Sequence, residues 1–237
     1  GEFNEKSAIP CSHAIRLTLQ KTRANMKPNW YERTLLPYLI DSACSVKAVR
    51  YQREKVVPLA RGRVLEIGIG TGLNLRHYDK ANIHSITGLD PALEMHKLAH
   101  KRMRSAGLEV ELVGLSAERI PRADASFDTV IVTYTLCTIP DPLAALKEMR
   151  RVLTPGGQLI FCEHGRAPDA GVRRWQERIT PWWKKVAGGY HLDRDIPSLL
   201  NEAGFDCPDL KTMYLPGPRP LSYNFWGVAF ARPGHGS

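Results

Sequence analysis

The glycine-rich segment VLEIGIGTG at residues 64–72 constrains the fold of this chain more than any other feature. An apolar run containing Glu66 breaks into three alternating glycines, Gly68, Gly70 and Gly72, before a helical pattern resumes. This pattern is typical of a strand that leads into a ligand-binding turn, because glycine permits unusual backbone dihedrals and leaves no side chain between backbone and ligand. A helix directly after the turn would add unpaired N–H groups. Such turns bind several nucleotide-like ligands, so the segment alone does not select one.

Length and composition predict one domain in a reducing compartment. The chain has 237 residues, of which 43% are hydrophobic, enough to build a core without covalent staples. No apolar run approaches the roughly 18 to 20 residues needed to cross a bilayer, so a cytoplasmic protein is expected. The cysteines are scattered without CxxC spacing, which favours neither a disulfide framework nor a zinc site. They are Cys11, Cys44, Cys137, Cys162 and Cys207.

The formal net charge of +9 is compatible with a phosphate-bearing partner or with plain solubility. No aromatic residues alternate with the densest basic cluster, so a solvated surface is favoured over nucleic-acid binding. His96 and His100 lie on the same predicted helix, but no third ligand follows and no metal site is expected. The basic cluster consists of Lys97, Lys101, Arg102 and Arg104.

The chain divides into a short terminal segment and one predicted domain. Residues 1–25 begin GEFNEKS and show no sustained period, which indicates a vector-derived remnant and a flexible terminus. The domain is expected over residues 26–237. Within it, residues 26–60 predict amphipathic helices that cover a ligand pocket, with a membrane surface as the alternative, and residues 165–205 predict an insertion beside the substrate.

Strand and helix patterns alternate after the glycine turn. Strands are expected at residues 85–90, 110–115, 127–136 and 158–164, and helices at residues 92–107 and 141–153. The second helix should begin with Asp141 as its N-cap and Pro142 in its first turn. Two closing strands are expected at residues 209–215 and 224–232. This rhythm predicts an α/β fold with a doubly wound, mostly parallel sheet.

Carboxylates near the ends of the first two strands indicate the ligand, because a doubly wound sheet binds ligands across the carboxyl ends of its strands. Asp90 lies about 20 residues after the glycines, the spacing at which a carboxylate accepts ribose hydroxyls, although it could instead cap the next helix. Glu66 would repel a pyrophosphate and suit a cationic ligand, such as the ammonium and sulfonium groups of S-adenosylmethionine (SAM).

Further motifs extend this pattern. SAERIP at residues 116–121, FDTVIVTYTLCTIPDP at residues 127–142 and LKEMRRVLTPGGQLIFCEH at residues 146–164 follow in order. With LEIGIGTG and GLD, they make the chain, over about residues 31–232, resemble the class I SAM-dependent methyltransferases. The resemblance implies a Rossmann-like seven-stranded sheet with an antiparallel edge hairpin. It also implies SAM as cofactor, S-adenosylhomocysteine as product, and no metal.

The resemblance also implies roles for individual residues. Asp90 would bind the ribose, Ser116 and Ala117 would lie at the adenine, and Thr133 would lie beside the amino-acid portion of SAM. Many relatives carry Asp where this chain has Ser116, so the adenine contact would come from the Ser hydroxyl or the backbone. The complete expected cofactor-binding set is Tyr31, Glu66, Gly68, Gly70, Gly72, Asn74, Asp90, Pro91, Ser116, Ala117 and Thr133.

The methyl acceptor is indicated by the carboxyl-terminal motifs. TLCTIPDP, CEHGRAP, GYHLDRDIP and PGPRPLSYNFWG resemble bacterial relatives of small-molecule thiol S-methyltransferases, so a thiol acceptor is expected. A thiol with a pKa near 8.5 ionises usefully unaided, whereas a phenol near 10 gains from a general base. O- or N-methylation of a quinone-like phenol or a phospholipid amine is the alternative. A non-catalytic SAM-binding protein is the third hypothesis.

Histidines and aromatic residues complete the expected site. His164 ends the fifth strand and His191 lies in GGYHLDRD; both are candidate general bases, although each could be structural. Cys137 follows the fourth strand and is a candidate either for the lining of the acceptor pocket or for a nucleophile. No nucleic-acid partner is expected, contact with a membrane surface stays possible, and the oligomeric state is open. The acceptor is expected beside the aromatic residues Tyr134, Tyr190, Tyr223 and Trp226.

Overall fold

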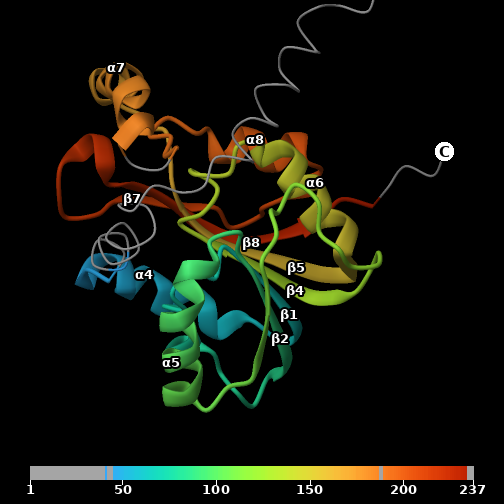
Figure 1. Cartoon of the computed structure of the whole chain (residues 1–237). Coiled ribbons are helices and arrows are strands. Elements are labelled where there is room, and N and C mark those ends of the chain that lie inside the picture. Colours follow the sequence, from blue (N-terminus) through green and yellow to red (C-terminus); the bar gives the residue numbers. More distant parts are fainter. Residues whose placement is uncertain (1–40, 42–44, 187–188, 234–237) are drawn as a thin grey trace, which may run out of the picture.

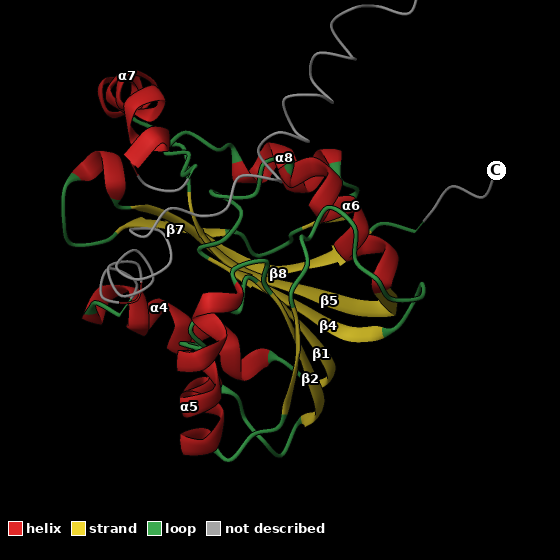
Figure 2. Cartoon of the chain, in the orientation of Figure 1, coloured by secondary structure: helices red, strands yellow, loops and turns green. Residues whose placement is uncertain are grey.

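The computed structural model describes residue 41, residues 45–186 and residues 189–233. The predicted terminal segment 1–25 and much of the predicted 26–60 region lie outside these residues. The described part is built on one mixed sheet of eight strands in the order β3-β2-β1-β4-β5-β8-β6, with β7 paired to β8 (Figures 1 and 2). The predicted doubly wound α/β class is therefore confirmed.

Five strands form the parallel part of the sheet. Neighbouring strands pair in parallel from β3 through β5, and β4 is buried along almost its whole length. A central parallel strand reads as a continuous apolar run because helices cover both of its faces. The five strands are β1 (Gly62–Ile67), β2 (Ile83–Leu89), β3 (Val110–Val113), β4 (Phe127–Thr133) and β5 (Leu153–His164).

The carboxyl-terminal strands run antiparallel, as expected. β8 (Tyr223–Ala231) pairs with β5 on one side and with both β7 (Lys211–Tyr214) and β6 (Phe205–Asp206) on the other. β7 and β8 correspond to the two predicted closing strands. The resemblance implied seven strands, and the sheet has eight, one of which, β6, is only two residues long.

Helices cover both faces of the sheet (Figure 2). α6 (Pro142–Val152) and α8 (Ile196–Glu202) contribute to one apolar cluster, while α4 (Lys47–Val56) and α5 (His96–Ala106) contribute to the other. The predicted cap of α6 is confirmed, since the Asp141 carboxylate accepts the Ala144 N–H at 3.0 Å. The remaining helical elements are α7 (Ala170–Val186) and the 3-10 turns η1 (Val57–Leu59), η2 (Leu75–His77), η3 (Leu93–Met95) and η4 (Arg219–Leu221).

One local prediction is wrong. The glycine turn is followed by turns and the short η2, and not by an α-helix. The side chains of Asn74 and Tyr78 turn inward and donate hydrogen bonds to Glu66 at 2.9 and 2.8 Å, which holds this segment in a turn. Helix N-terminal N–H groups are therefore not offered to a ligand at this position. Across the described ranges, no helix is both long and apolar enough to span a bilayer.

Candidate active site

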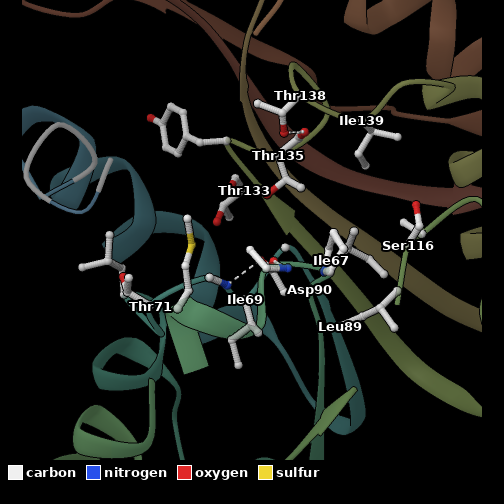
Figure 3. A pocket seen from close by; sticks show the side chains of 18 of the residues that line it. Ile67, Ile69, Thr71, Leu89, Asp90, Ser116, Thr133, Thr135, Thr138 and Ile139 are labelled. Atoms are coloured by element: carbon white, nitrogen blue, oxygen red, sulfur yellow. Dashed lines mark hydrogen bonds between the residues drawn. The ribbon is translucent and has the colours of Figure 1, made fainter. Parts of the chain in front are cut away.

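A cavity of about 430 Å³ lies at the carboxyl ends of β1, β2 and β4 (Figure 3). Its lining comes from segments far apart in the chain that the parallel sheet brings to one edge. They come from the end of each strand and the residues after it: residues 67–71 and 73 at β1, residues 89–92, 94 and 95 at β2, residues 115–117 after β3, and residues 133–135 and 138–140 at β4. Arg53 of α4 and Asp41 add charged groups. The ligand site predicted at the strand ends thus has a cavity at the expected edge.

The glycine turn lets the backbone border this cavity directly. Gly68 has φ +67°, and a Cβ there would lie 2.3 Å from Thr135 Oγ1, so only glycine fits. Gly70 has φ +51°, and a Cβ there would approach Met95 Sδ at 3.5 Å and Asp90 Oδ2 at 3.8 Å, two atoms of lining residues. The missing side chain at Gly70 therefore leaves space inside the cavity for a ligand.

Asp90 is held in a fixed orientation at the end of β2. Its Oδ2 accepts the Gly70 N–H and its Oδ1 accepts the Ala92 N–H, both at 2.8 Å. The residue is 8% exposed, and burial raises the pKa of the carboxyl, a shift that the two backbone N–H groups partly offset. Each carboxylate oxygen keeps a second lone pair, so Asp90 can still accept hydrogen bonds from a ligand.

Glu66 does not line the cavity, contrary to the direct ligand contact expected from the sequence. Its Oε1 accepts from Asn74 and its Oε2 from Tyr78, and burial raises the pKa of this carboxyl to about 7. Asn74 is also fully buried behind the lining, and its Oδ1 accepts from Arg53 at 2.7 Å. The structure therefore places Glu66 at the base of a polar network that ends at Arg53.

Arg53 is a cavity residue that the sequence analysis missed. One of its terminal nitrogens donates to both Asn74 Oδ1 and Thr133 Oγ1, and its guanidinium lies 5.2 Å from the centre of the Tyr134 ring. The residue is 6% exposed, and its buried Nε has no hydrogen-bond partner among the described residues. A signal was present in the sequence, because Arg53 follows Val49 by four residues and precedes Val56 by three, which places a cation on the apolar helix face.

Tyr134 and Glu163 shape the lining after β4. Tyr134 has φ +54°, and its hydroxyl donates to Asn224 Oδ1 at 2.7 Å. Glu163 Oε1 accepts the Thr135 N–H at 2.8 Å, and its carboxylate also accepts from the backbone of Leu136 and Cys137. Burial nevertheless raises the pKa of Glu163 to about 7. This carboxylate, which sequence reasoning also missed, fixes the loop that carries Tyr134 and Thr135.

The three candidate catalytic residues do not line the cavity. His164 is 2% exposed, with Nε2 3.2 Å from the Pro220 carbonyl oxygen, and burial lowers the pKa of its ring to about 4. Burial likewise lowers the pKa of His191 to about 4, and its backbone N–H donates to the Cys137 carbonyl oxygen at 2.8 Å. Cys137 is completely buried. The structure therefore places none of these three residues among the described lining of the cavity.

Of the expected aromatic residues, Tyr134 lines the cavity and three do not. The Tyr223 ring packs edge-on against Tyr214 and Phe225. The Trp226 ring lies under Lys55 Nζ at 4.7 Å, and the Tyr190 ring is 5.8 Å from that of His164.

Some of the expected cofactor-binding residues line the cavity and others do not. Gly72, like Glu66 and Asn74, is not one of the lining residues, and Tyr31 lies outside the described residues. Ser116 lines the cavity and its hydroxyl contacts Glu118. In the part of the chain that the structure describes, no group of three His, Cys, Asp or Glu side chains could hold a metal ion. The expected residues that line the cavity are Gly68, Gly70, Asp90, Pro91, Ser116, Ala117 and Thr133.

Comparison with known proteins identifies the fold and its relatives. Residues 65–161 match the model of a methyltransferase domain. The thiol S-methyltransferase TMT1B of Homo sapiens is 35% identical over 167 residues, covering 68% of each chain. Its Rattus norvegicus counterpart is 34% identical over 146 residues, 60% of this chain and 59% of the relative. The chain thus spans about three fifths to two thirds of these relatives.

A relative with another named activity and a solved structure also match. The phosphatidylethanolamine N-methyltransferase of Cereibacter sphaeroides is 36% identical over 134 residues, 56% of this chain and 64% of the relative. The crystal structure of a SAM-dependent methyltransferase from Methanosarcina mazei superposes with a TM-score of 0.57 at 24% identity, covering 70% of this chain and 91% of that one. The likeness to that structure concerns the fold.

Proposed function

The chain belongs to the class I SAM-dependent methyltransferases, and we propose that it transfers the methyl group of SAM to the sulfur of a small, mostly apolar thiol. The use of SAM follows from the family, whereas the thiol is the proposal. Relatives named thiol S-methyltransferases support it. The chemistry of the cavity supports it independently.

The observation that carries the thiol proposal is the kind of titratable group around the cavity. No histidine or lysine occurs among its described lining residues, and the pKa of the Tyr134 phenol is raised well above 10 by burial. The carboxylates of the lining are Asp41, which is bound by Arg102, Asp90, which is bound by two backbone N–H groups, and Glu94; carboxylates are ordinarily weak bases. A phenol or an ammonium acceptor must lose a proton to a base before it attacks. A thiol, with a pKa near 8.5, ionises in a useful fraction near neutral pH without one. A cavity of this composition therefore favours a thiol.

The lining fits SAM. Asp90 offers oriented acceptors that suit ribose hydroxyls, and the unpartnered Nε of Arg53 offers a donor that suits a carboxylate. Gly70 leaves open space, and Leu89 and Ile139 supply apolar wall. We assign Asp90 to the ribose and Arg53 to the carboxylate of the methionine portion. Seven of the cofactor-binding residues expected from the sequence belong to this same lining.

The reaction needs little covalent help from the protein. SAM supplies a methyl group made electrophilic by a positively charged sulfonium. The acceptor thiol loses its proton to water, and its sulfur forms a bond to the methyl carbon as the sulfonium–carbon bond breaks. The electron pair of that bond remains on the sulfur of S-adenosylhomocysteine. In our proposal, the glycine turn and the loop held by Glu163 align the two sulfurs and exclude water.

A lipid amine or a quinone-like phenol is the competing acceptor. The relative named phosphatidylethanolamine N-methyltransferase supports the lipid amine as an alternative. A protein that binds SAM without transfer is the third hypothesis.

The deciding experiment is transfer of a labelled methyl group from SAM to matched alkyl thiols, phenols, amines and phosphatidylethanolamine vesicles, with products identified by mass spectrometry. We expect thioethers alone, at a rate that rises with pH as the thiol ionises. Products from phenols or amines alone would replace the thiol proposal with the alternative. SAM binding without any product would support the non-catalytic hypothesis.

A further inference from the structure

The outer face of α7 carries exposed tryptophans. Trp175 is 59% exposed and Trp182 is 74% exposed. The two positions are seven residues apart, which is about two turns of an α-helix, so both side chains project from the same side. Large aromatic side chains in water are uncommon enough to require an explanation when two of them share a helix face.

Basic side chains accompany these tryptophans. Arg174 and Arg178 are exposed; Arg178 lies three residues after Trp175 and four residues before Trp182, and Arg174 lies four residues before Arg178, so each is a helical neighbour of the next. The single carboxylate within α7, Glu177, is 3.5 Å from Arg166 and so is partly neutralised. The outer face of α7 therefore combines two indole rings with two guanidinium groups.

Buried polar side chains of α7 help to hold the helix to the body of the protein. Gln176 is fully buried; its Oε1 accepts the Ala167 N–H at 2.9 Å and its Nε2 donates to the Gly165 carbonyl at 3.1 Å. Thr180 is also buried. Gln176 and Thr180 lie about 100° to 140° around the helix axis from Trp175, so these buried contacts come from a different side of α7 than the exposed tryptophans.

We propose that the outer face of α7 docks on an anionic lipid surface. Indole rings favour the interface of a bilayer, where the ring is buried and the N–H stays near polar groups. Arginines beside them pair with lipid phosphates, and the net charge of +9 attracts the whole protein to a negative surface. The positive charge of this face selects anionic lipid over a neutral one.

The position of α7 gives this docking a consequence. α7 follows β5 after a short connection, so it begins at the carboxyl edge of the sheet, which is the edge that carries the cavity (Figure 1). A docked α7 would bring that edge close to the bilayer, where apolar acceptors concentrate. The docking itself does not depend on which acceptor is methylated.

Vesicle co-sedimentation of the full chain, without SAM or acceptor, tests the proposal. We expect binding to phosphatidylcholine vesicles that contain phosphatidylglycerol, weak binding to phosphatidylcholine alone, and release at high salt. The double variants W175A/W182A and R174Q/R178Q should each lower the partition coefficient by about tenfold or more. W175F/W182F should retain part of the binding, because it keeps aromatic rings on the face.

A matched control removes the same charge from another helix. Lys97 and Lys101 are exposed on α5, and K97Q/K101Q should change the partition coefficient by less than about twofold. Far-UV circular dichroism and thermal melting show whether each variant is folded. The proposal is overturned if the wild-type protein ignores anionic vesicles, or if folded W175A/W182A binds them as well as wild type. It is also overturned if that variant changes the oligomeric state without lipid, because the face would then be a protein interface.

Discussion

Arg53 on α4 donates a hydrogen bond to Thr133 Oγ1 at the end of β4, over 2.5 Å and across 80 residues of sequence. This bond ties a helix to the strand end that borders the cavity. It also keeps a guanidinium buried near Glu66 and Glu163, whose pKa values of about 7 leave both only partly ionised near neutral pH. Because a buried cation without a full counter-charge is costly, the geometry favours an anionic group of a ligand at Arg53.

Replacing Arg53 should weaken the binding of SAM selectively. We expect R53Q to lose about 1.5 to 3 kcal/mol of SAM affinity, which is the size of a charge-assisted hydrogen bond. Decarboxylated SAM, which lacks the group assigned to Arg53, should bind R53Q and wild type with similar affinity. Isothermal titration calorimetry with both ligands measures the difference.

The control for this prediction is Arg63, which pairs with Asp128 at 3.0 Å on the surface. R63Q removes the same charge away from the cavity and should leave both affinities unchanged. If folded R53Q lost equal affinity for SAM and for decarboxylated SAM, Arg53 would not bind the carboxylate. Its role would then be to position Thr133.

Replacing Asp90 should weaken SAM binding through the ribose. D90A removes oriented acceptors and should cost about 1.5 to 3 kcal/mol of affinity for both SAM and decarboxylated SAM. This pattern differs from that of R53Q, because the ribose is common to both ligands. D124N, at a carboxylate whose side chain is 79% exposed, is the matched control. Unchanged affinity in calorimetry of D90A would place the ribose elsewhere.

The sheet and the edge that carries the cavity could be predicted from the sequence, because both depend on local periodicity and glycine spacing. Gly68, Gly70 and Asp90 lie where the spacing placed them. Burial and partner choice depend on the fold, so His164 could not be recognised as an inward-facing side chain from its position at a strand end. The hydrogen bonds from Asn74 and Tyr78 that engage the Glu66 carboxylate could not be predicted for the same reason.

The pKa of Glu66 predicts a pH-dependent stability. Its carboxyl has a pKa of about 7 when folded and an ordinary value of 4.5, so the native state binds the proton more tightly than the unfolded state. Glu66 therefore contributes fully to the free energy of unfolding below pH 4.5. This contribution falls by up to about 3 kcal/mol as the pH rises to about 7. E66Q imitates the protonated side chain and should flatten this part of the curve. Urea unfolding at several pH values, with the exposed E54Q as control, measures it; parallel curves for E66Q and wild type would contradict the prediction.

His164 should have the opposite effect on the pH dependence of stability, and it should not act as a general base in methyl transfer. Its ring has a pKa of about 4 when folded against 6.5 ordinarily, so it lowers stability as pH falls from 6.5 to 4. H164Q should reduce this acid sensitivity, whereas H84Q, at an exposed ring, should not. A general base would cost about a hundredfold or more in kcat when removed, and we expect a loss of under about threefold in H164Q. Steady-state kinetics with an alkyl thiol distinguishes the two.

Gly68 offers a test of why the turn needs glycine, because the chain contains a matched position. Gly68 and Gly156 both have positive φ, at +67° and +76°, so Ala at either should cost about 1 to 2 kcal/mol of backbone strain. A Cβ at Gly156 meets no atom within 4 Å, whereas at Gly68 it meets Thr135 at 2.3 Å. G68A should therefore lose about 1 to 3 kcal/mol more unfolding free energy than G156A, from overpacking. Equal losses in urea unfolding would mean that backbone conformation alone selects glycine at residue 68, and that the contact with Thr135 relaxes freely.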